Sequence, residues 1–271
     1  MLGATVDQKG SSVTEEKLRF DFNAKAALTP AQLVAVEAEL NRVVKADLKV
    51  SSDMVPLAQA QAINGLRAVF GEKYPDPVRV VSVGTDVQAL LEAPESPAWL
   101  DSSIEFCGGT HLQRTGQALA VCVVEEAAVA KGIRRVSAIT GPGAVEALRR
   151  GDLLAARFAA VETDVDAFAS DDGGGDGDGD GDGGEALGAL EADIVTFRAA
   201  LDAATMSAGR KGELRSSVEA LQRRVAGLRN EAFLKAFQQR IRPSLAQVRE
   251  AQAAGLRRAV LSFDVGCDGK A

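Results

Sequence analysis

The sequence has few of the side chains that most metal and nucleophile sites use. Among its 271 residues there are one histidine, His111, and three cysteines, Cys107, Cys122 and Cys267. Chemistry that needs two histidines would have to be completed by another chain. So few cysteines exclude a small disulfide scaffold. The 46% hydrophobic and 25% charged residues are those of an ordinary globular protein.

Long apolar runs are absent as well. The longest stretches, such as residues 118–124, fall far short of the roughly 20 residues that cross a bilayer. Residues 1–4 do not have the pattern with which a signal peptide or a transit peptide begins. We therefore expect no membrane partner and a cytoplasmic protein with reduced thiols, with an organellar location as the alternative.

Charge is distributed unevenly along the chain. The formal net charge is −7, and residues 171–185 alone hold seven acids and no base. Residues 193–260 carry 13 basic and 6 acidic side chains, so only this part is suited to a polyanion. A solvated helix face explains the same pattern, and we expect no DNA partner. The candidate residues for contact with a phosphate backbone are Arg210, Lys211, Arg215, Arg223, Arg224 and Arg229.

A glycine and aspartate tract divides the chain. It cannot bury apolar area or hold a regular backbone, so we expect a disordered linker over 166–186. The ordered pattern of an EF-hand loop is missing, which argues against calcium. The expected organisation is a domain at 1–165, this linker, a helical hairpin at 187–242 and the start of a further domain at 243–271.

The first domain is predicted to be α+β, with a mostly antiparallel sheet. Thr29, Pro30 and Gln32 predict the start of a helix of about 17 residues, because they supply an N-cap, a preset first residue and a capping box. A shorter helix is expected over 56–62, a loop over 65–77 and a surface excursion over 85–101. The expected strands are 18–22, 78–83, 103–106, 118–124 and 133–139, before a helix at 144–161.

Two heptad-like stretches follow the acidic tract. Apolar residues recur at alternating spacings of three and four over 187–201 and again over 214–228. The polar segment 207–212 is a natural turn, so the pair predicts an antiparallel helical hairpin. We expect Pro243 to interrupt the second helix and residues 259–265 to begin a strand.

The sharpest local signal is the sequence CGGTH at residues 107–111. A thiolate and an imidazole four residues apart, with two glycines between them, can converge on one Zn²⁺ at a strand end. A catalytic dyad of Cys107 and His111 is the alternative, although nucleophilic cysteines usually gain from a helix N-terminus. Cys122 lies in an apolar strand and is expected in the core.

Several ordered stretches resemble one family. IEFCGGTH at 104–111 is followed by Thr115 and Gly116, and by KGIRRVSAITG at 131–141. Upstream lie further matching stretches: QKGS at 8–11, LRFDF at 18–22, FGEKY at 70–74 and VRVVSVG at 78–84. Together they closely resemble the editing domain of alanyl-tRNA synthetase. Residues 85–101 look more like the eukaryotic form, and residues 264–271 look like the opening of the family's last domain.

The resemblance implies a function. Editing domains of this family hydrolyse serine or glycine wrongly attached to tRNA(Ala), in a pocket that holds zinc. The family binds this metal through an HxxxH pair and the cysteine and histidine of CGGTH, which correspond here to Cys107 and His111. Gln8 matches a glutamine near that pocket, and the backbone of Gly108, Gly109 and Thr110 should line it.

The sequence departs from the family at the metal. The HxxxH helix belongs just upstream of residues 2–3, and His111 is the only histidine, so two of four zinc ligands are present. The aminoacylation domain, with its ATP site, is also missing. We therefore expect a fragment of the ligase that by itself binds zinc weakly or not at all and has little deacylase activity. The alternatives are a free-standing trans-editing deacylase, which would need its own HxxxH pair, and a non-catalytic tRNA-binding module.

Overall fold

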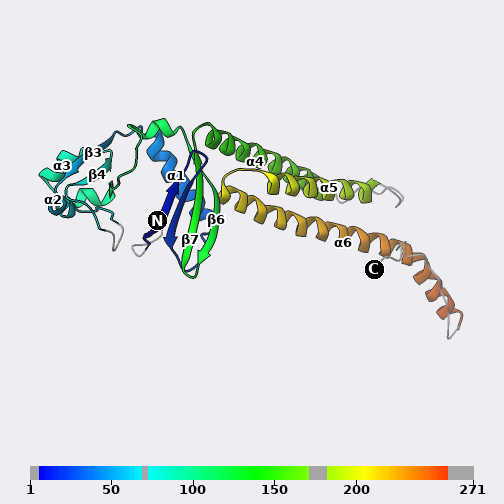
Figure 1. The fold of residues 1–271 in the computed structure, drawn as a ribbon. Coiled ribbons are helices and arrows are strands. Elements are labelled where there is room, and N and C mark those ends of the chain that lie inside the picture. Colours follow the sequence, from blue (N-terminus) through cyan, green and yellow to red (C-terminus); the bar gives the residue numbers. More distant parts are fainter. Residues whose placement is uncertain (1–5, 69–72, 171–181, 256–271) are drawn as a thin grey trace. The chain divides into compact units, whose positions relative to one another are not determined.

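The computed structural model describes residues 6–68, 73–170 and 182–255 (Figure 1). The chain forms two compact units. The first unit comprises Met1–Leu153 with Ala204–Glu213, and the second comprises Leu154–Ala203 with Leu214–Ala271. In the described residues, no helix is long and apolar enough to span a membrane.

The first unit contains two antiparallel sheets, which confirms the predicted α+β class. One sheet has four strands in the order β1-β2-β7-β6, and the other has three in the order β3-β4-β5. The four-stranded sheet consists of β1 (Gln8–Val13), β2 (Leu18–Asn23), β7 (Ile133–Thr140) and β6 (Val121–Ala130). The three-stranded sheet consists of β3 (Val50–Val55), β4 (Val78–Val83) and β5 (Ser103–Phe106).

Helix α1 (Pro30–Lys45) begins as its sequence predicts. The backbone N–H of Gln32 donates to the Thr29 hydroxyl at 3.2 Å, and the Gln32 side-chain oxygen accepts from the Thr29 N–H at 2.9 Å. This reciprocal capping box satisfies two N–H groups that a helix start leaves unpaired. The predicted start of the helix is confirmed.

Successive side chains of β6 point to opposite faces of the four-stranded sheet, and an apolar cluster lies on each face. Val121 and Val123 pack with α1, whereas Cys122 packs with the first turns of α4 (Gly141–Ser170). The first cluster consists of Leu33, Val44, Val121, Val123 and Ala138. The second consists of Ala120, Cys122, Ala144 and Ala147.

The three-stranded sheet has its own core beneath two short helices, α2 (Leu57–Gln61) and α3 (Val87–Glu92). Its buried members are Val55, Ala60, Ile63, Val78, Val80, Val87, Leu90 and Ile104. Trp99, in the short helix η1 (Pro97–Asp101), packs against them from the rim. This core fixes β4 and β5, the strands that position the CGGTH segment.

Some elements differ from those expected. Strands β1 and β3 were missed because they are polar edge strands with little apolar alternation. The segment 85–101, expected as a surface excursion, contains α3 and η1, and Val87 and Leu90 of α3 are buried in the core. Strand β6 begins at Val121 after the short helix η2 (Thr115–Ala118), later than the expected 118–124.

The second unit contains α4 from Leu154 onward, α5 (Asp182–Ala203) and the part of α6 (Ala208–Ala253) that follows Glu213. Asp202 pairs with Arg215 and Glu191 pairs with Arg229, so α5 and α6 run antiparallel and the predicted hairpin is confirmed. The Phe158 and Phe197 rings, 5.5 Å apart, join α4 to α5. The buried seam contains Phe158, Val161, Val165, Leu187, Ile194, Phe197, Leu201, Leu214, Val218, Leu221 and Val225.

The expected interruption at Pro243 is wrong, because α6 continues through it to Ala253. Proline removes one helical N–H bond and crowds the carbonyl four residues back, so a helix that retains it bends. The orange end of α6 turns away from the helix axis in Figure 1. The strand expected at 259–265 lies outside the described residues.

The expected linker 166–186 overlaps helices at both ends. Helix α4 continues through Ser170 because Val165 is fully buried against the bundle, and α5 begins at Asp182. Residues 171–181, which hold most of the glycine and aspartate tract, lie outside the described residues. The helices therefore extend closer to the tract than the sequence suggested.

Candidate functional site

The CGGTH segment follows β5, an edge strand of the three-stranded sheet. Ile104 is fully buried, and the Phe106 ring lies 4.8 Å from that of Tyr74, centroid to centroid. Because side chains alternate along a strand, Glu105 and Cys107 point to the opposite face. The strand register therefore brings a carboxylate and a thiol to the same side.

Arg79 on the neighbouring strand β4 holds the turn. Its backbone carbonyl accepts a hydrogen bond from the Cys107 N–H at 3.3 Å. Its guanidinium donates to the carbonyl oxygens of Cys107, at 3.5 Å, and Gly109, and to the Ser52 hydroxyl at 3.2 Å. One side chain thus fixes two carbonyl groups of a turn that has little regular structure of its own.

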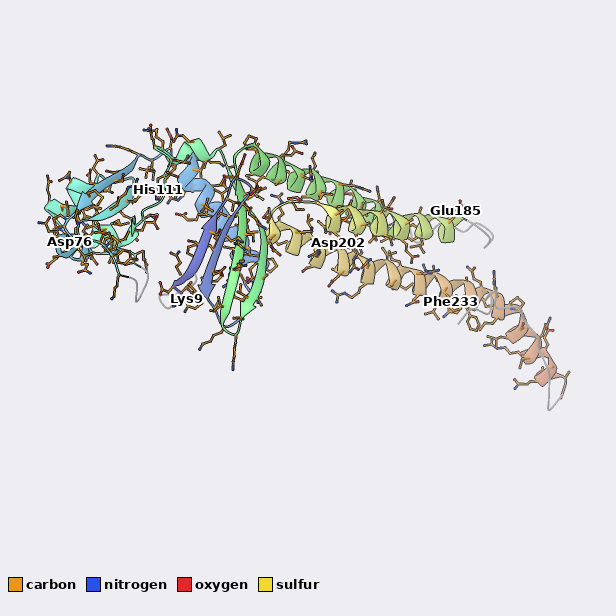
Figure 2. All side chains as sticks on the ribbon, in the orientation of Figure 1. Lys9, Asp76, His111, Glu185, Asp202 and Phe233 are labelled. Carbon is orange, nitrogen blue, oxygen red and sulfur yellow. The ribbon has the colours of Figure 1, made fainter. Side chains whose placement is uncertain are left out.

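Three potential metal donors converge at this turn. The ligand atoms of Glu105, Cys107 and His111 all lie within 4.8 Å of one another. Glu105 and Cys107 are half-buried and His111 is exposed. Figure 2 labels His111 at this position. The sequence predicted Cys107 and His111 as ligands, and the structure brings these two together.

This donor set suits zinc. A tetrahedral Zn²⁺ with bonds of about 2.0–2.3 Å holds its ligands about 3.3–3.8 Å apart, so small side-chain rotations would bring these three donors to such distances. Thiolate, imidazole and carboxylate are all ordinary zinc ligands. The backbone leaves room as well, since a Cβ added at Gly108 would meet no atom within 4 Å.

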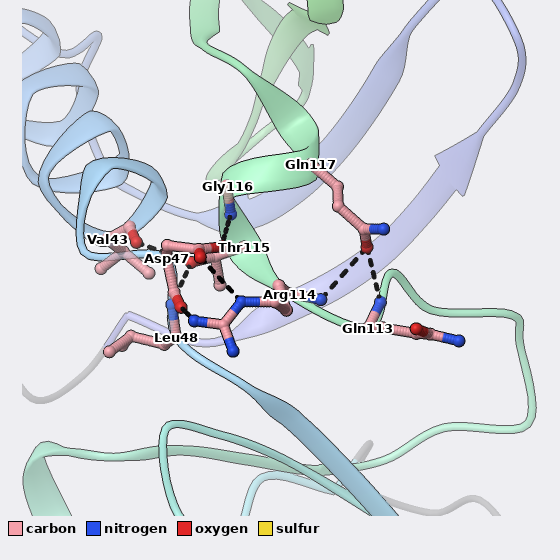
Figure 3. Close-up of polar contacts among 8 residues, drawn as sticks. All are labelled: Val43, Asp47, Leu48, Gln113, Arg114, Thr115, Gly116 and Gln117. Atoms are coloured by element: carbon pink, nitrogen blue, oxygen red, sulfur yellow. Dashed lines mark hydrogen bonds and ion pairs between the residues drawn. The ribbon is translucent and has the colours of Figure 1, made fainter.

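A polar cluster around Asp47 anchors the chain just after the turn (Figure 3). The Asp47 carboxylate accepts from the Arg114 side chain at 2.7 Å and from the Gly116 N–H at 3.2 Å. The Thr115 hydroxyl donates to the Val43 carbonyl and accepts from the Leu48 N–H, each at 2.8 Å. Residues 107–113 are therefore held at both ends, by Arg79 and by this Asp47 cluster.

The predicted pocket residues lie on different elements. Gly108, Gly109 and Thr110 form the turn between Cys107 and His111. Gln8 lies on β1 of the four-stranded sheet, where its side-chain amide donates to the Ser11 hydroxyl at 3.0 Å. In the hydrogen bonds of the described residues, Gln8 does not contact the turn, so its place in the pocket stays a prediction.

Cys122 is a core residue, as its sequence context predicts. It is fully buried, and burial together with the Glu37 carboxyl raises the pKa of its thiol to about 12. A thiol with such a pKa is neither a nucleophile nor a metal ligand at neutral pH. Cys267 lies outside the described residues.

Most of the basic residues proposed for tRNA contact are engaged in the fold. Arg210, Arg215, Arg224 and Arg229 form ion pairs with Asp152, Asp202, Asp166 and Glu191. Lys211 donates to the Ala204 carbonyl at 2.8 Å, and Arg223 is exposed. These pairs cancel much of the positive charge that the hairpin sequence carries.

Two residues of the candidate site were missed by sequence reasoning. Glu105 could have been found from its spacing, because it lies two positions before Cys107 on a strand and so shares its face. Arg79 gave a weaker signal, since it is the one charged residue in the apolar strand β4. Its partnership with the turn depends on strand pairing, which the local sequence does not specify.

Comparison with known proteins gives one family match. A model described as "Threonyl and Alanyl tRNA synthetase second additional domain" matches residues 78–137. This range includes β4, β5, the CGGTH turn and the Arg114–Gln117 part of the Asp47 cluster.

Curated relatives match over a longer range. An alanine–tRNA ligase of Schizosaccharomyces pombe is 48% identical over 161 residues, which are 59% of this chain and 17% of the relative. A mitochondrial alanine–tRNA ligase of Saccharomyces cerevisiae is 51% identical over 166 residues, 61% of this chain and 16% of the relative. A cytoplasmic one of Dictyostelium discoideum is 46% identical over 158 residues, 58% of this chain and 17% of the relative. The matched part thus spans about one sixth of the length of these relatives.

Proposed function

Because the chain contains the region of the alanyl-tRNA synthetase family that carries the second additional domain, we propose that its CGGTH turn is an editing site. The reaction is hydrolysis of the ester that links serine or glycine to tRNA(Ala). The observation that carries the proposal is the convergence of Cys107 and His111 in the matched region. The proposed partner is tRNA(Ala).

The residues of the turn have distinct roles in this proposal. Cys107 and His111 would hold Zn²⁺, which when bound supplies a Lewis acid with an open position for water or the substrate's amino group. The N–H groups of Gly108, Gly109 and Thr110 line the approach to the ester. Water adds to the ester carbonyl, the bond to the ribose oxygen breaks, and serine leaves as the free acid with the tRNA hydroxyl restored.

Within a ligase, this hydrolysis would support accurate alanyl-tRNA formation. ATP-dependent aminoacylation would take place in other parts of such an enzyme. The matched relatives include ligases named cytoplasmic and a ligase named mitochondrial, and the location that we propose for this protein is the cytoplasm.

Single-turnover deacylation of Ser-tRNA(Ala) tests the proposal. With zinc and excess protein, the chain should release serine slowly but measurably faster than buffer, because it contains Cys107 and His111, two of the family's four zinc ligands. Cys107→Ser and His111→Gln should fall to the buffer rate, whereas Glu95→Gln, an exposed acid outside the donor set, should not. Equal rates for the wild-type chain and the two ligand variants would reject the editing site.

A further inference from the structure

We propose that Glu105 is a third metal ligand, which completes a Glu105, Cys107 and His111 site within this chain. The inference deepens the proposed function and rests on it, because it assigns a ligand to the same turn. The sequence indicated a site with two ligands. The structure adds a carboxylate at the same distance range, within 4.8 Å of both other donors.

The backbone fixes the position of this carboxylate. Glu105 lies in the paired part of β5, opposite Val81 of β4. On its other side the strand is flanked by Arg67, whose N–H donates to the Ile104 carbonyl at 2.8 Å and whose carbonyl accepts from the Phe106 N–H at 3.2 Å. The Glu105 backbone is therefore held from both sides. A ligand on a rigid strand loses less conformational entropy on binding than one on a loop.

The carboxylate has no competing protein partner in the part of the chain that the structure describes. Glu105 takes part in none of the ion pairs there and accepts none of the side-chain hydrogen bonds. The Arg79 guanidinium, the nearest cation to the turn by its contacts, is directed at the carbonyls of Cys107 and Gly109 and at Ser52. A half-buried carboxylate that is left free while its neighbours are paired is available to a metal ion.

The charges of the three donors also match a divalent cation. A thiolate and a carboxylate together carry two negative charges, and the imidazole is neutral when it binds a metal. Zn²⁺ with these ligands forms an electrically neutral centre, which costs little to hold at a half-buried position. Three protein ligands and one open position are the arrangement of catalytic zinc sites.

Metal titration of the full chain tests the proposal. We would measure zinc affinity by competition with a chromophoric chelator, and record the absorption spectrum of the Co²⁺-loaded protein. The variants are Glu105→Gln, Cys107→Ser and, as the matched control, Glu95→Gln. Glu105→Gln should weaken zinc binding by at least about tenfold, since even residues that only support a ligand cost 10–100-fold. It should keep the cobalt–thiolate band and change the ligand-field bands, and Glu95→Gln should match the wild type.

Several outcomes would overturn the proposal. If Glu105→Gln binds zinc as tightly as the wild type while Cys107→Ser does not, Glu105 is no ligand and the two-ligand site of the proposed function stands. If Cys107→Ser also binds like the wild type, the zinc part of the proposed function fails too. A lower unfolding temperature of the metal-free Glu105→Gln chain, with an unchanged cobalt spectrum, would assign Glu105 a structural role instead.

Discussion

The guanidinium of Arg79 donates a hydrogen bond to the carbonyl oxygen of Gly109, 30 residues further along the chain. The N–H of Cys107 returns a hydrogen bond to the Arg79 carbonyl at 3.3 Å. Cys107, the first of the proposed metal ligands, and the middle of the turn are therefore fixed to the same residue of β4. The spacing between Cys107 and His111 depends on this contact as much as on the turn's own sequence.

Arg79→Met should loosen the turn and leave the sheet intact. Met fills a similar volume but cannot donate to the two carbonyls, so we expect zinc affinity to fall by about 10–100-fold. Loss of an exposed contact to the backbone should lower the free energy of unfolding by only about 1 kcal/mol. Chelator competition and urea unfolding measure the two effects. Arg42→Met, which removes an exposed ion pair with Glu39 on α1, is the control and should leave zinc affinity unchanged.

Gly116→Ala should disrupt the Asp47 cluster. A Cβ at this position would lie 2.5 Å from Asp47 Oδ1, which accepts from the Gly116 N–H, while Arg114 donates to the other oxygen, Oδ2, of the same carboxylate. We expect a loss of about 1–3 kcal/mol in the free energy of unfolding, typical of overpacking. In Gly188→Ala the added Cβ meets nothing within 4 Å, and this helical position should gain stability or stay neutral. Thermal unfolding measures the stability of both variants. Equal unfolding temperatures of Gly116→Ala and Gly188→Ala would show that the Asp47 cluster tolerates the methyl group.

Cys107 should react with iodoacetamide far faster than Cys122 in the folded protein. The pKa of the Cys122 thiol is about 12, so on the order of one molecule in ten thousand carries its thiolate at pH 8. Cys122 is also fully buried, whereas Cys107 is half-buried. Peptide mapping by mass spectrometry follows each site separately. Zinc should slow the labelling of Cys107, and labelling that zinc does not affect would argue against a metal at this thiol.

The stability of the first unit should fall as the pH rises through the titration of Glu37. Burial raises the pKa of this carboxyl above its ordinary 4.5, although the Val123 N–H donates to it at 2.8 Å. Above pH 4.5 the unfolded chain loses this proton while the folded chain retains it, so unfolding becomes more favourable until the folded group ionises.

Urea unfolding between pH 4 and 8 measures this effect. Relative to the wild type, Glu37→Gln should gain stability as the pH rises above 4.5. Glu39→Gln on the same helix is the control with the opposite sign. The Arg42 guanidinium lowers the pKa of Glu39, so its contribution is lost as the pH falls. If the free energy of unfolding depends on pH in the same way in the wild type and in Glu37→Gln, Glu37 does not have a raised pKa in the folded protein.

The elements that were predicted correctly from the sequence are those whose own residues specify them. The capping box of Thr29 and Gln32 fixed the start of α1, and the three-and-four spacing of Leu214, Val218 and Leu221 identified the hairpin. The convergence of Cys107 and His111 followed from two glycines in a short segment. At the helix start and in the hairpin, local chemistry determines the structure. The geometry of the turn also depends on its hydrogen bonds with Arg79.

The features that were missed depend on tertiary contacts. Strand β3 is polar, and it forms because β4 offers a partner from Val50 through Val55. Arg79 reads locally as an ordinary charged residue of a strand, and only its pairing beside β5 brings it to the turn. Pro243 was expected to end α6, but a proline bends a helix whose remaining hydrogen bonds are intact. The formation of β3 and the position of Arg79 depend on residues that are distant in the sequence, and the local sequence pattern does not identify these residues.

We propose that the CGGTH turn removes the wrong amino acid from tRNA(Ala). The most direct measurement compares the single-turnover release of serine and of alanine from the same tRNA(Ala), with zinc and excess protein. An editing site predicts that serine is released faster than alanine and that His111→Gln abolishes the difference. Equal release of the two amino acids by the wild-type chain, or a difference that persists in His111→Gln, would contradict it.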